Sequence, residues 1–341
     1  MSVQTWLNRS WYGPAPRPWL VPLEGLFGAL SAGRRIAYRR GWFASARVAA
    51  PVVVVGNLTV GGAGKTPLVD WLARRLAAAG WRPGIATRGY RGRSKAARLV
   101  QATDLAAVVG DEPVLLARRS GRPVAVARER AAAARLLLAS GCDLVICDDG
   151  LQHYALAREV EIAVIDGERR FGNGHLLPAG PLREPAGRLA QVDAVVVNGG
   201  EPRRGELAMR LEAEHAVPLA GGAPRPLAAF AGKPVHAVAG IGHPQRFFAM
   251  LRAAGIEPIE HPLDDHAPIG GALQRLTDRI PVLMTEKDAV KCLDRADERH
   301  FYVPVEARFG AADEAALLRI VEARLAGARR GATDEDEVRR G

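Results

Sequence analysis

The sequence is poor in cysteine and aromatic residues, and it has no apolar run long enough to cross a bilayer. Its three cysteines, Cys142, Cys147 and Cys292, form no CxxC motif and no cluster with histidine. This argues against structural zinc and disulfide bonds, and indicates a reduced, intracellular protein. Aromatic residues make up only 6% of the chain and are not interleaved with base-reaching side chains, so we expect no nucleic-acid partner.

Acidic residues are almost absent from residues 1–47, where Glu24 alone opposes seven arginines. The stretch Trp19–Ala32 is nearly all apolar, but at about 14 residues it is shorter than the roughly 20 that a transmembrane helix requires. Residues at helical spacing give this stretch one apolar face, formed by Leu23, Leu26, Phe27 and Leu30.

Tryptophans flank this apolar face, as interfacial aromatics do, at positions Trp6, Trp11, Trp19 and Trp42. Arginines beside an apolar helical face are attracted to anionic lipid headgroups. We therefore predict that residues 1–47 form an amphipathic helix lying in a membrane interface. The alternative is an amphipathic helix docked on the core of the protein itself.

The rest of the chain alternates short apolar runs with helical runs, which is typical of a parallel sheet covered by helices on both faces. Pro, Gly, Arg and Ala dominate residues 201–226 and predict a linker, after which a shorter alternation begins. The predicted organisation is a membrane-associated segment (1–47), an α/β core domain (48–225), a smaller α/β domain (226–327) and a disordered tail (328–341).

A glycine-rich segment, Gly61 to Thr66, follows the apolar strand Val52–Val55 and precedes leucines at helical spacing. Glycines let backbone N–H groups turn onto phosphate oxygens, and the helix N-terminus adds its positive end. Lys65 can then reach the β and γ phosphates, and the Thr66 hydroxyl supplies a ligand to Mg²⁺. We predict that Mg²⁺·ATP is held by the loop residues Thr59, Val60, Gly61, Gly62, Ala63, Gly64, Lys65 and Thr66.

The loop departs from the full phosphate-loop pattern at its first position, where Thr59 replaces glycine. It also resembles the loop of partition-type ATPases, but Val60 occupies the place of their first lysine, which argues against a dimerising switch ATPase. A switch or partition-type ATPase acting on a protein or nucleic-acid partner is the alternative from another class. A kinase for some other amphiphilic or sugar alcohol is the alternative among enzymes.

Two adjacent acids, Asp148 and Asp149, follow the apolar strand Leu144–Cys147. Mg²⁺ is commonly held by a carboxylate at the end of a strand beside the phosphate loop, so Asp148 is a candidate metal ligand together with Thr66. Adjacent side chains on an extended strand point to opposite sides. If extended geometry persists at these positions, one acid faces the metal and the other is available for another role.

Further motifs are distributed along the chain. They are Gly56-Asn57-Leu58-Thr59, Thr87-Arg88-Gly89-Tyr90, Gly110-Asp111-Glu112-Pro113, Asp148-Asp149-Gly150-Leu151-Gln152-His153-Tyr154, the run Arg170 to Glu184, Asp265-His266 and Met284 to Lys291. In type, order and spacing this set resembles the tetraacyldisaccharide 4′-kinases of Gram-negative bacteria, over roughly residues 20–305.

The resemblance implies a kinase that moves the γ-phosphoryl group of ATP to the 4′-hydroxyl of tetraacyldisaccharide 1-phosphate, giving lipid IVA. It also implies an α/β fold with a P-loop NTPase-type parallel-sheet domain, a smaller Rossmann-like domain and an N-terminal membrane-interface helix. Its partners would be the lipid A disaccharide precursor and the inner-membrane lipid surface. The protein would then lie at the cytoplasmic face of the inner membrane, as a peripheral or monotopic protein.

The resemblance places a catalytic acid at Asp111, which would accept or orient the 4′-hydroxyl proton. The apolar pair Val108-Val109 before it predicts a strand-to-helix turn at the sheet edge. The alternative is that Asp111 only caps the helix that starts at Pro113. Glu112 is a further candidate for holding Mg²⁺ or its waters.

The resemblance also brings His266 of the second domain toward Asp149, where the pair would assist catalysis once the domains close. Lys65 completes the set of predicted catalytic residues. Candidate contacts to the anionic substrate are Arg88, Arg183 and Asn173.

Overall fold

Strand β1, Val52–Gly56, forms the centre of the larger of two sheets. Its four valines are β-branched and buried on both faces, which suits an inner strand of a parallel sheet. Strands β5 and β6 flank it, and both run parallel to it.

The computed structural model describes residues 3–265, 267, 269–292 and 297–340.

The large sheet has the strand order β15-β8-β7-β6-β1-β5-β2-β4-β3. Its edge strands β3 and β15 are antiparallel to their neighbours, and the inner pairs are parallel. The strands are β1, β2 (Pro83–Thr87), β3 (Arg98–Val100), β4 (Val124–Val126), β5 (Leu144–Asp148), β6 (Val160–Asp166), β7 (Ala194–Asn198), β8 (Leu207–Glu212) and β15 (Glu306–Phe309).

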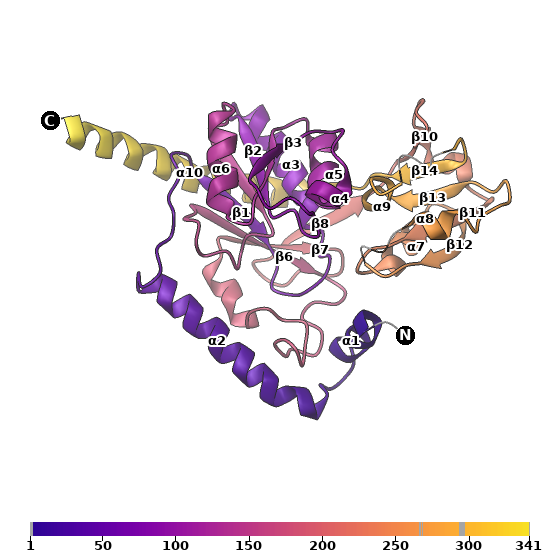
Figure 1. Ribbon diagram of the computed structural model, residues 1–341, viewed down its shortest axis with the longest axis horizontal. Helices are drawn as coiled ribbons and strands as arrows, with labels where there is room; N and C mark the ends of the chain where they lie inside the picture. Colours follow the sequence, from indigo (N-terminus) through magenta and orange to yellow (C-terminus); the bar gives the residue numbers. More distant parts are fainter. Residues whose placement is uncertain (1–2, 266, 268, 293–296, 341) are drawn as a thin grey trace.

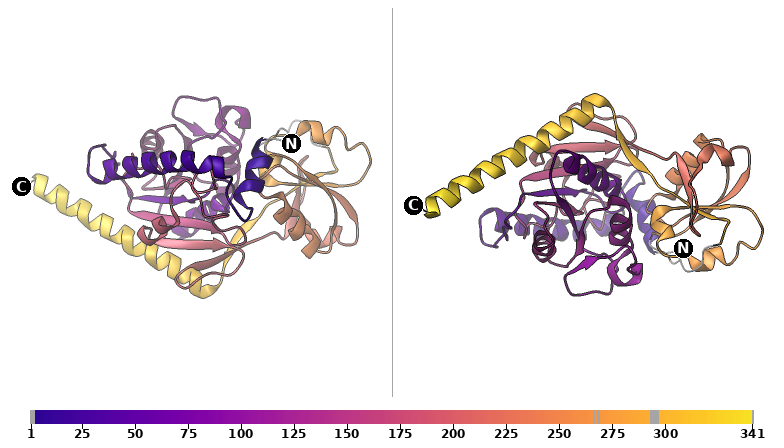
Figure 2. Two further views of the ribbon diagram at one scale, coloured as in Figure 1. Left: turned by 90° about the horizontal axis from the view of Figure 1, so that it is seen from below. Right: turned by 90° about the horizontal axis from the view of Figure 1, so that it is seen from above.

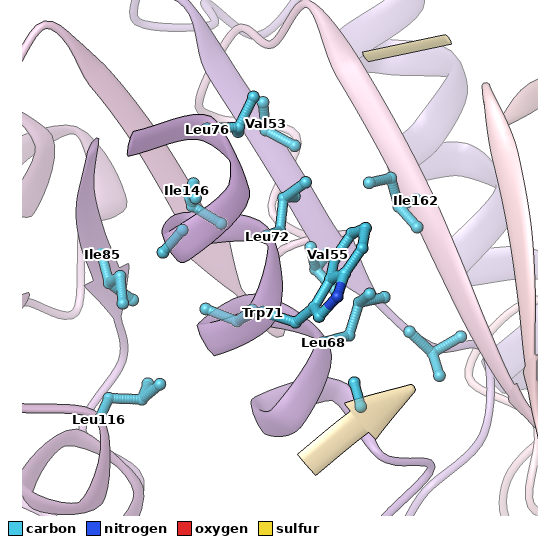
Figure 3. Packing of buried hydrophobic residues seen from close by; sticks show 14 of the residues in the cluster. Val53, Val55, Leu68, Trp71, Leu72, Leu76, Ile85, Leu116, Ile146 and Ile162 are labelled. Carbon is cyan, nitrogen blue, oxygen red and sulfur yellow. The ribbon is translucent and has the colours of Figure 1, made fainter. Parts of the chain in front are cut away.

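Helices cover both faces of this sheet. Because side chains alternate along a strand, Val53 and Val55 pack against α3 (Lys65–Ala78), as Figure 3 shows, whereas Val52 and Val54 join the cluster on the side of α6 (Arg130–Ala139). The other helices of this domain are α4 (Ala106–Val109), α5 (Asp111–Ser120), η2 (Ala186–Gln191) and α10 (Ala311–Arg340).

The small domain lies beside the carboxyl edge of the large sheet (Figure 1) and has the strand order β10-β9-β14-β13-β11-β12. Its strands are β9 (His215–Pro218), β10 (Arg225–Pro226), β11 (Pro234–Ala239), β12 (Glu257–Pro262), β13 (Val282–Thr285) and β14 (His300–Val303). Its helices are η3 (Leu227–Phe230), α7 (Pro244–Ala253), α8 (Gly270–Leu273) and α9 (Glu286–Ala289).

The domain boundaries differ from those that the sequence predicts, 48–225 and 226–327. The expected linker contains β8, β9 and β10, and the chain crosses between sheets at residues 213–214. It returns after β14, because β15 pairs with β8 and adds an edge strand to the large sheet. Hydrogen bonds between segments about a hundred residues apart decide this boundary, and local composition does not report them.

Helix α10 continues through residues 328–340, which the sequence predicts as a disordered tail. This segment contains no proline, and eight of its thirteen residues are arginine, aspartate or glutamate, so no residue in it forces a helix that has already started to end. Figure 2 shows α10 as a long helix that leaves the body of the molecule at its C-terminal end.

The N-terminal helices are α1 (Val3–Trp11), η1 (Pro18–Leu20) and α2 (Val21–Arg39), and α2 runs along one edge of the large domain (Figure 1). Within the described residues, none of the helices has the length and apolarity needed to span a bilayer.

Candidate active site

Four neighbouring strands of the large sheet end in polar groups or glycine at one edge. Their last residues are Gly56 on β1, Asp148 on β5, Asp166 on β6 and Asn198 on β7. Ligands of open α/β sheets bind at the carboxyl ends of the strands, so this edge is the first place to look for a site.

The glycine-rich loop connects β1 to α3 and lies at this edge. Gly61 and Gly64 have φ values of 104° and 93°, a region that favours glycine. A Cβ at Gly64 would also lie 2.4 Å from the amide nitrogen of Asn198. These two glycines are therefore required by the backbone, which turns here into the N-terminus of α3 as the sequence predicts.

Lys65 begins α3 and turns its ammonium group back over the loop. Its Nζ donates to Oδ1 of Asn57 at 3.0 Å and lies 3.4 Å from Oδ1 of Asp149. These contacts hold the ammonium group at the edge of the sheet, where an anionic phosphate would meet it.

Asp148 is buried beside the loop. Its Oδ2 accepts from the Thr66 hydroxyl at 3.4 Å, and its Oδ1 is buried without a hydrogen-bond partner. Burial, followed by repulsion from Glu112, raises the pKa of Asp148 to about 7. A cation beside Oδ1 would relieve both penalties, so the pair Thr66 and Asp148 fits a Mg²⁺ ion.

No group of three or more His, Cys, Asp or Glu side chains in the described part of the chain is arranged to hold a metal ion. Mg²⁺ keeps several waters and uses substrate phosphates as ligands in nucleotide sites, so one hydroxyl and one carboxylate are a sufficient protein contribution.

Asp149 follows the last residue of β5 and does not keep the extended geometry on which the sequence-based expectation depends. Its φ of 52° lies in the left-handed region, which turns the chain sharply out of β5. Both carboxylate oxygens contact Nη1 of Arg183, at 3.1 and 3.0 Å. Burial opposes ionisation, but Lys65 and Arg183 lower the pKa of Asp149 well below its usual range.

Asp111 is the first residue of α5, and it follows a short helix, α4, rather than a strand. The expected strand-to-helix turn at Val108-Val109 is therefore wrong, because these valines pack as one turn of helix. Gly110 occupies the N-cap position and no side chain caps α5. Asp111 is buried, and its Oδ2 lies 3.9 Å from Nζ of Lys291.

Glu112 faces the small domain. Its Oε1 lies 3.2 Å from Nζ of Lys287, which also approaches Oδ1 of Asp265 at 3.5 Å. Burial lowers the pKa of Lys287, but the nearby carboxylates of Glu112 and Asp265 raise it. The net result is a pKa above the ordinary value of lysine. His266, the predicted partner of Asp149, lies outside the described residues.

The predicted substrate contacts lie in different surroundings. Arg88 is exposed and lines the cleft, and Arg183 is paired with Asp149. Asn173 is not brought to the phosphate loop: its Nδ2 donates to the carbonyls of Ala179 and Ser10, and its Oδ1 accepts from the His175 backbone. In this structure Asn173 shapes its own loop.

Several of these residues line one cleft of about 1630 Å³ between the two domains, whereas Asp111, Asp148 and Asn173 are not part of its lining. The phosphate loop, Asp149 and Arg183 line it from the large domain, and Asp265 and Lys287 from the small domain. The N-terminal segment adds Leu7, Trp11 and Arg34. A phosphate-binding loop, the carboxylate of Asp149 and apolar side chains thus meet in one space, which is large enough for a nucleotide and a second substrate.

A family model described as "Tetraacyldisaccharide-1-P 4'-kinase" matches residues 16–326. The chain belongs to the tetraacyldisaccharide-1-P 4′-kinase family. Relatives named tetraacyldisaccharide 4′-kinase include one from Stenotrophomonas maltophilia, 50% identical over 90% of this chain and 94% of that protein. Another, from Alkalilimnicola ehrlichii, is 53% identical over 89% of this chain and 91% of that protein.

A solved structure is similar over most of its length. The LpxK of Aquifex aeolicus, crystallised in complex with ATP, matches with a TM-score of 0.75 and 26% identity, over 89% of this chain and 98% of that chain. The resemblance drawn from the motifs, the α/β fold class and the kinase class are therefore confirmed. The alternative of a switch or partition-type ATPase is not supported.

Three side chains that belong to the site in this family member were not among the candidates. Arg130 is buried, and its Nη2 donates to the backbone carbonyls of Asp148 and Asp149 at 3.2 and 3.5 Å. Asn57 contacts Lys65, and Asn198 contacts the loop. Asn57 belongs to the Gly56-Asn57-Leu58-Thr59 motif, and Asn198 ends an apolar strand, so the sequence contained a signal for both residues. The atoms that they contact depend on the tertiary structure.

Proposed function

We propose that this chain transfers the γ-phosphoryl group of Mg²⁺·ATP to the 4′-hydroxyl of tetraacyldisaccharide 1-phosphate, forming lipid IVA at the cytoplasmic face of the bacterial inner membrane. The supporting observation is the shared cleft. The phosphate loop, Lys65 and Asp149 line this cleft, Asp148 contacts Thr66 from beside it, and the N-terminal segment contributes Leu7, Trp11 and Arg34 to the lining.

Phosphoryl transfer needs its charge neutralised and its acceptor aimed in line, and little covalent help from the protein. The loop amides and the Lys65 ammonium would bind the β and γ phosphates. Thr66 and Asp148, with Glu112 nearby, would hold Mg²⁺, which when bound neutralises charge on the β and γ oxygens.

Asp111 is proposed to orient the 4′-hydroxyl and to take its proton. It enters α5 next to Glu112 and close to Lys291, so its carboxylate is held at the boundary between the two domains. Gly110 occupies the N-cap position of α5, and no side chain caps this helix. Helix capping is therefore a weaker explanation for Asp111 than the sequence alone suggests. Asp149 with His266 would assist, and Arg88 and Arg183 would contact anionic groups of the substrate.

The membrane assignment is supported by the side of α2 that faces outward. Large apolar residues exposed in the N-terminal segment are Trp19, Val21, Leu23, Leu26, Leu30, Ile36, Trp42 and Phe43. Leu23, Leu26 and Leu30 recur at helical spacing, and a large exposed apolar surface commonly marks a membrane or protein interaction site. The exposed Arg40, whose guanidinium lies 5.5 Å from the centroid of the Trp42 ring, would meet anionic headgroups.

The deciding experiment mixes detergent-solubilised protein with Mg²⁺, γ-labelled ATP and tetraacyldisaccharide 1-phosphate. We expect label in a bisphosphorylated lipid. If ATP is hydrolysed and no labelled lipid forms, the acceptor assignment is wrong and the ATPase alternative is favoured instead.

A second experiment tests Asp111. The variant Asp111→Asn keeps the shape of the side chain and should lose turnover while the protein still binds ATP. Near-normal turnover would mean that Asp111 has a structural role only.

A further inference from the structure

Three consecutive carbonyl groups of the phosphate loop each accept a hydrogen bond from a side chain outside the loop. The donors come from three different places: the residue after β1, the loop after β6 and the end of β7. The pairs are Asn57 Nδ2 with the Gly61 carbonyl (3.2 Å), Arg169 Nη2 with the Gly62 carbonyl (3.2 Å) and Asn198 Nδ2 with the Ala63 carbonyl (3.1 Å).

The direction of each carbonyl fixes the direction of the next amide. In a trans peptide the C=O and the following N–H point to opposite sides of the same plane. Hydrogen bonds to these three carbonyls therefore fix the directions of the N–H groups of Gly62, Ala63 and Gly64. Those are the amides that a phosphate-binding loop presents to its ligand.

We propose that Asn57, Arg169 and Asn198 are positioning residues that preorganise the amides of the phosphate loop for the β and γ phosphates of ATP. This inference rests on the proposed use of ATP. Inward-pointing amides repel one another when no anion is present, and donors on the opposite ends of the same peptide groups hold them in place.

The two asparagines are suited to this role because they are buried. The Oδ1 of Asn57 accepts from the Lys65 ammonium group, which can only donate, so its Nδ2 is left to donate to the loop. Asn198 lies directly against Gly64, where any side chain would collide with it. Lys65 therefore determines which atom of Asn57 faces the loop, and the close approach of Gly64 determines the position of Asn198.

Arg169 is held on every side. Its Nε pairs with Asp166 at 3.1 Å, and its guanidinium lies 4.8 Å from the centroid of the Tyr12 ring. Its two remaining nitrogens donate to different domains, Nη2 to the phosphate loop and Nη1 to the carbonyl of Gly242 at 3.2 Å. Lysine cannot reproduce these directed contacts, because its ammonium is a point charge without a planar fork.

Gly242 itself lies against the loop. A Cβ built there would be 3.2 Å from the Gly62 nitrogen. One guanidinium thus connects the loop to the small domain and to the N-terminal segment, so the order of the loop is tied to the placement of both.

The neighbouring arginine is a matched control. Arg170 pairs with Glu206 through both terminal nitrogens, at 3.1 and 2.5 Å, and none of its described contacts is with the phosphate loop. Arg169→Lys and Arg170→Lys therefore make the same chemical change at adjacent positions, and only the first removes a donor from the loop.

The test measures binding of Mg²⁺·ATP and of AMP to the full chain by calorimetry, together with KM for ATP and kcat. For Arg169→Lys we expect ATP affinity to fall about tenfold, from the loss of one directed hydrogen bond to a charged donor. AMP lacks the β and γ phosphates, so its affinity should not change. KM for ATP should rise more than kcat falls, and Arg170→Lys should match the wild type.

ATP affinity of Arg169→Lys equal to that of the wild type would overturn the inference, as would equal losses for ATP and AMP. Asn198→Ser is a second variant with the same expected split between ATP and AMP, should Arg169→Lys fold poorly in a thermal-unfolding control. Failure of the lipid acceptor alone would appear as wild-type ATP binding without lipid product, and would leave this comparison of variants intact.

Discussion

Helices α2 and α3 have similar apolar spacing and opposite surroundings. Leu68, Leu72 and Leu76 of α3 are each 0% exposed, whereas Leu23, Leu26 and Leu30 of α2 are 49%, 60% and 66% exposed. Helix α3 inserts its leucines between the large sheet and α5. Helix α2 turns its leucines away from the protein.

The contacts of α2 explain this orientation. Glu24 accepts from the Leu176 backbone and pairs with His175, and Arg35 pairs with the buried Glu184. Helix α2 therefore docks through its polar side, the reverse of the usual arrangement of a surface helix. The comparison teaches that an apolar stripe predicts that something covers it, and does not say whether protein or lipid does so.

The largest expected effect separates the two helices by function. Lys65 starts α3 and contacts Asn57 and Asp149 at the site. Lys65→Ala should lower kcat/KM by about a thousandfold or more, because it removes a positive charge from the transferring group. Sedimentation with anionic vesicles should be unchanged, and the labelled-ATP assay measures the loss. Loss of vesicle binding in this variant would break the separation between the two helices.

The next effect concerns stability. Leu72→Ala in the fully buried face of α3 should cost about 2–5 kcal/mol in the free energy of unfolding, from lost burial and the cavity left behind. Leu26→Ala on α2 should change it by less than about 0.5 kcal/mol, because that side chain is already exposed. Denaturant unfolding of both variants measures the difference. Equal losses would mean that the α2 face is covered by protein in solution.

A third test measures membrane binding, with stability and ATP binding as the controls. The double variant Leu26→Ser, Leu30→Ser should weaken binding to anionic vesicles by about tenfold or more while unfolding and ATP binding stay as in the wild type. Vesicle flotation measures the first and calorimetry the second. Substitution is sharper than deletion of residues 1–47, because deletion also removes the contacts of Glu24 and Arg35 with the large domain. Vesicle binding that survives the double variant would argue against the apolar anchor.

The smallest effect is that of salt. Arginines near an anionic surface contribute roughly 1 kcal/mol each and are screened within about a Debye length. Raising salt from about 0.1 to 1 M, where the Debye length falls to about 3 Å, should therefore weaken vesicle binding several-fold without releasing the protein completely. The stability difference between Leu72→Ala and Leu26→Ala should persist at both salt concentrations. Complete release at high salt would mean that the apolar face adds little.

The local sequence pattern predicts structure correctly where the residues of a single segment determine its conformation. The valine run before a glycine-rich turn predicts β1, the loop and α3, because burial on both faces and phosphate binding each demand a narrow set of residue types at fixed spacing. The motif set identified the family for the same reason.

Only the tertiary structure decided which distant segments complete those local units. The edge strand β15 joins β8, Arg130 holds the backbone of the acid pair, and Asn57, Arg169 and Asn198 hold the carbonyls of the phosphate loop. Each of these is a hydrogen bond whose partner is chosen by folding and leaves no periodic trace in the chain. Periodicity reports which side of an element is apolar; the packing of the whole molecule determines what that side, and every polar group beside it, will contact.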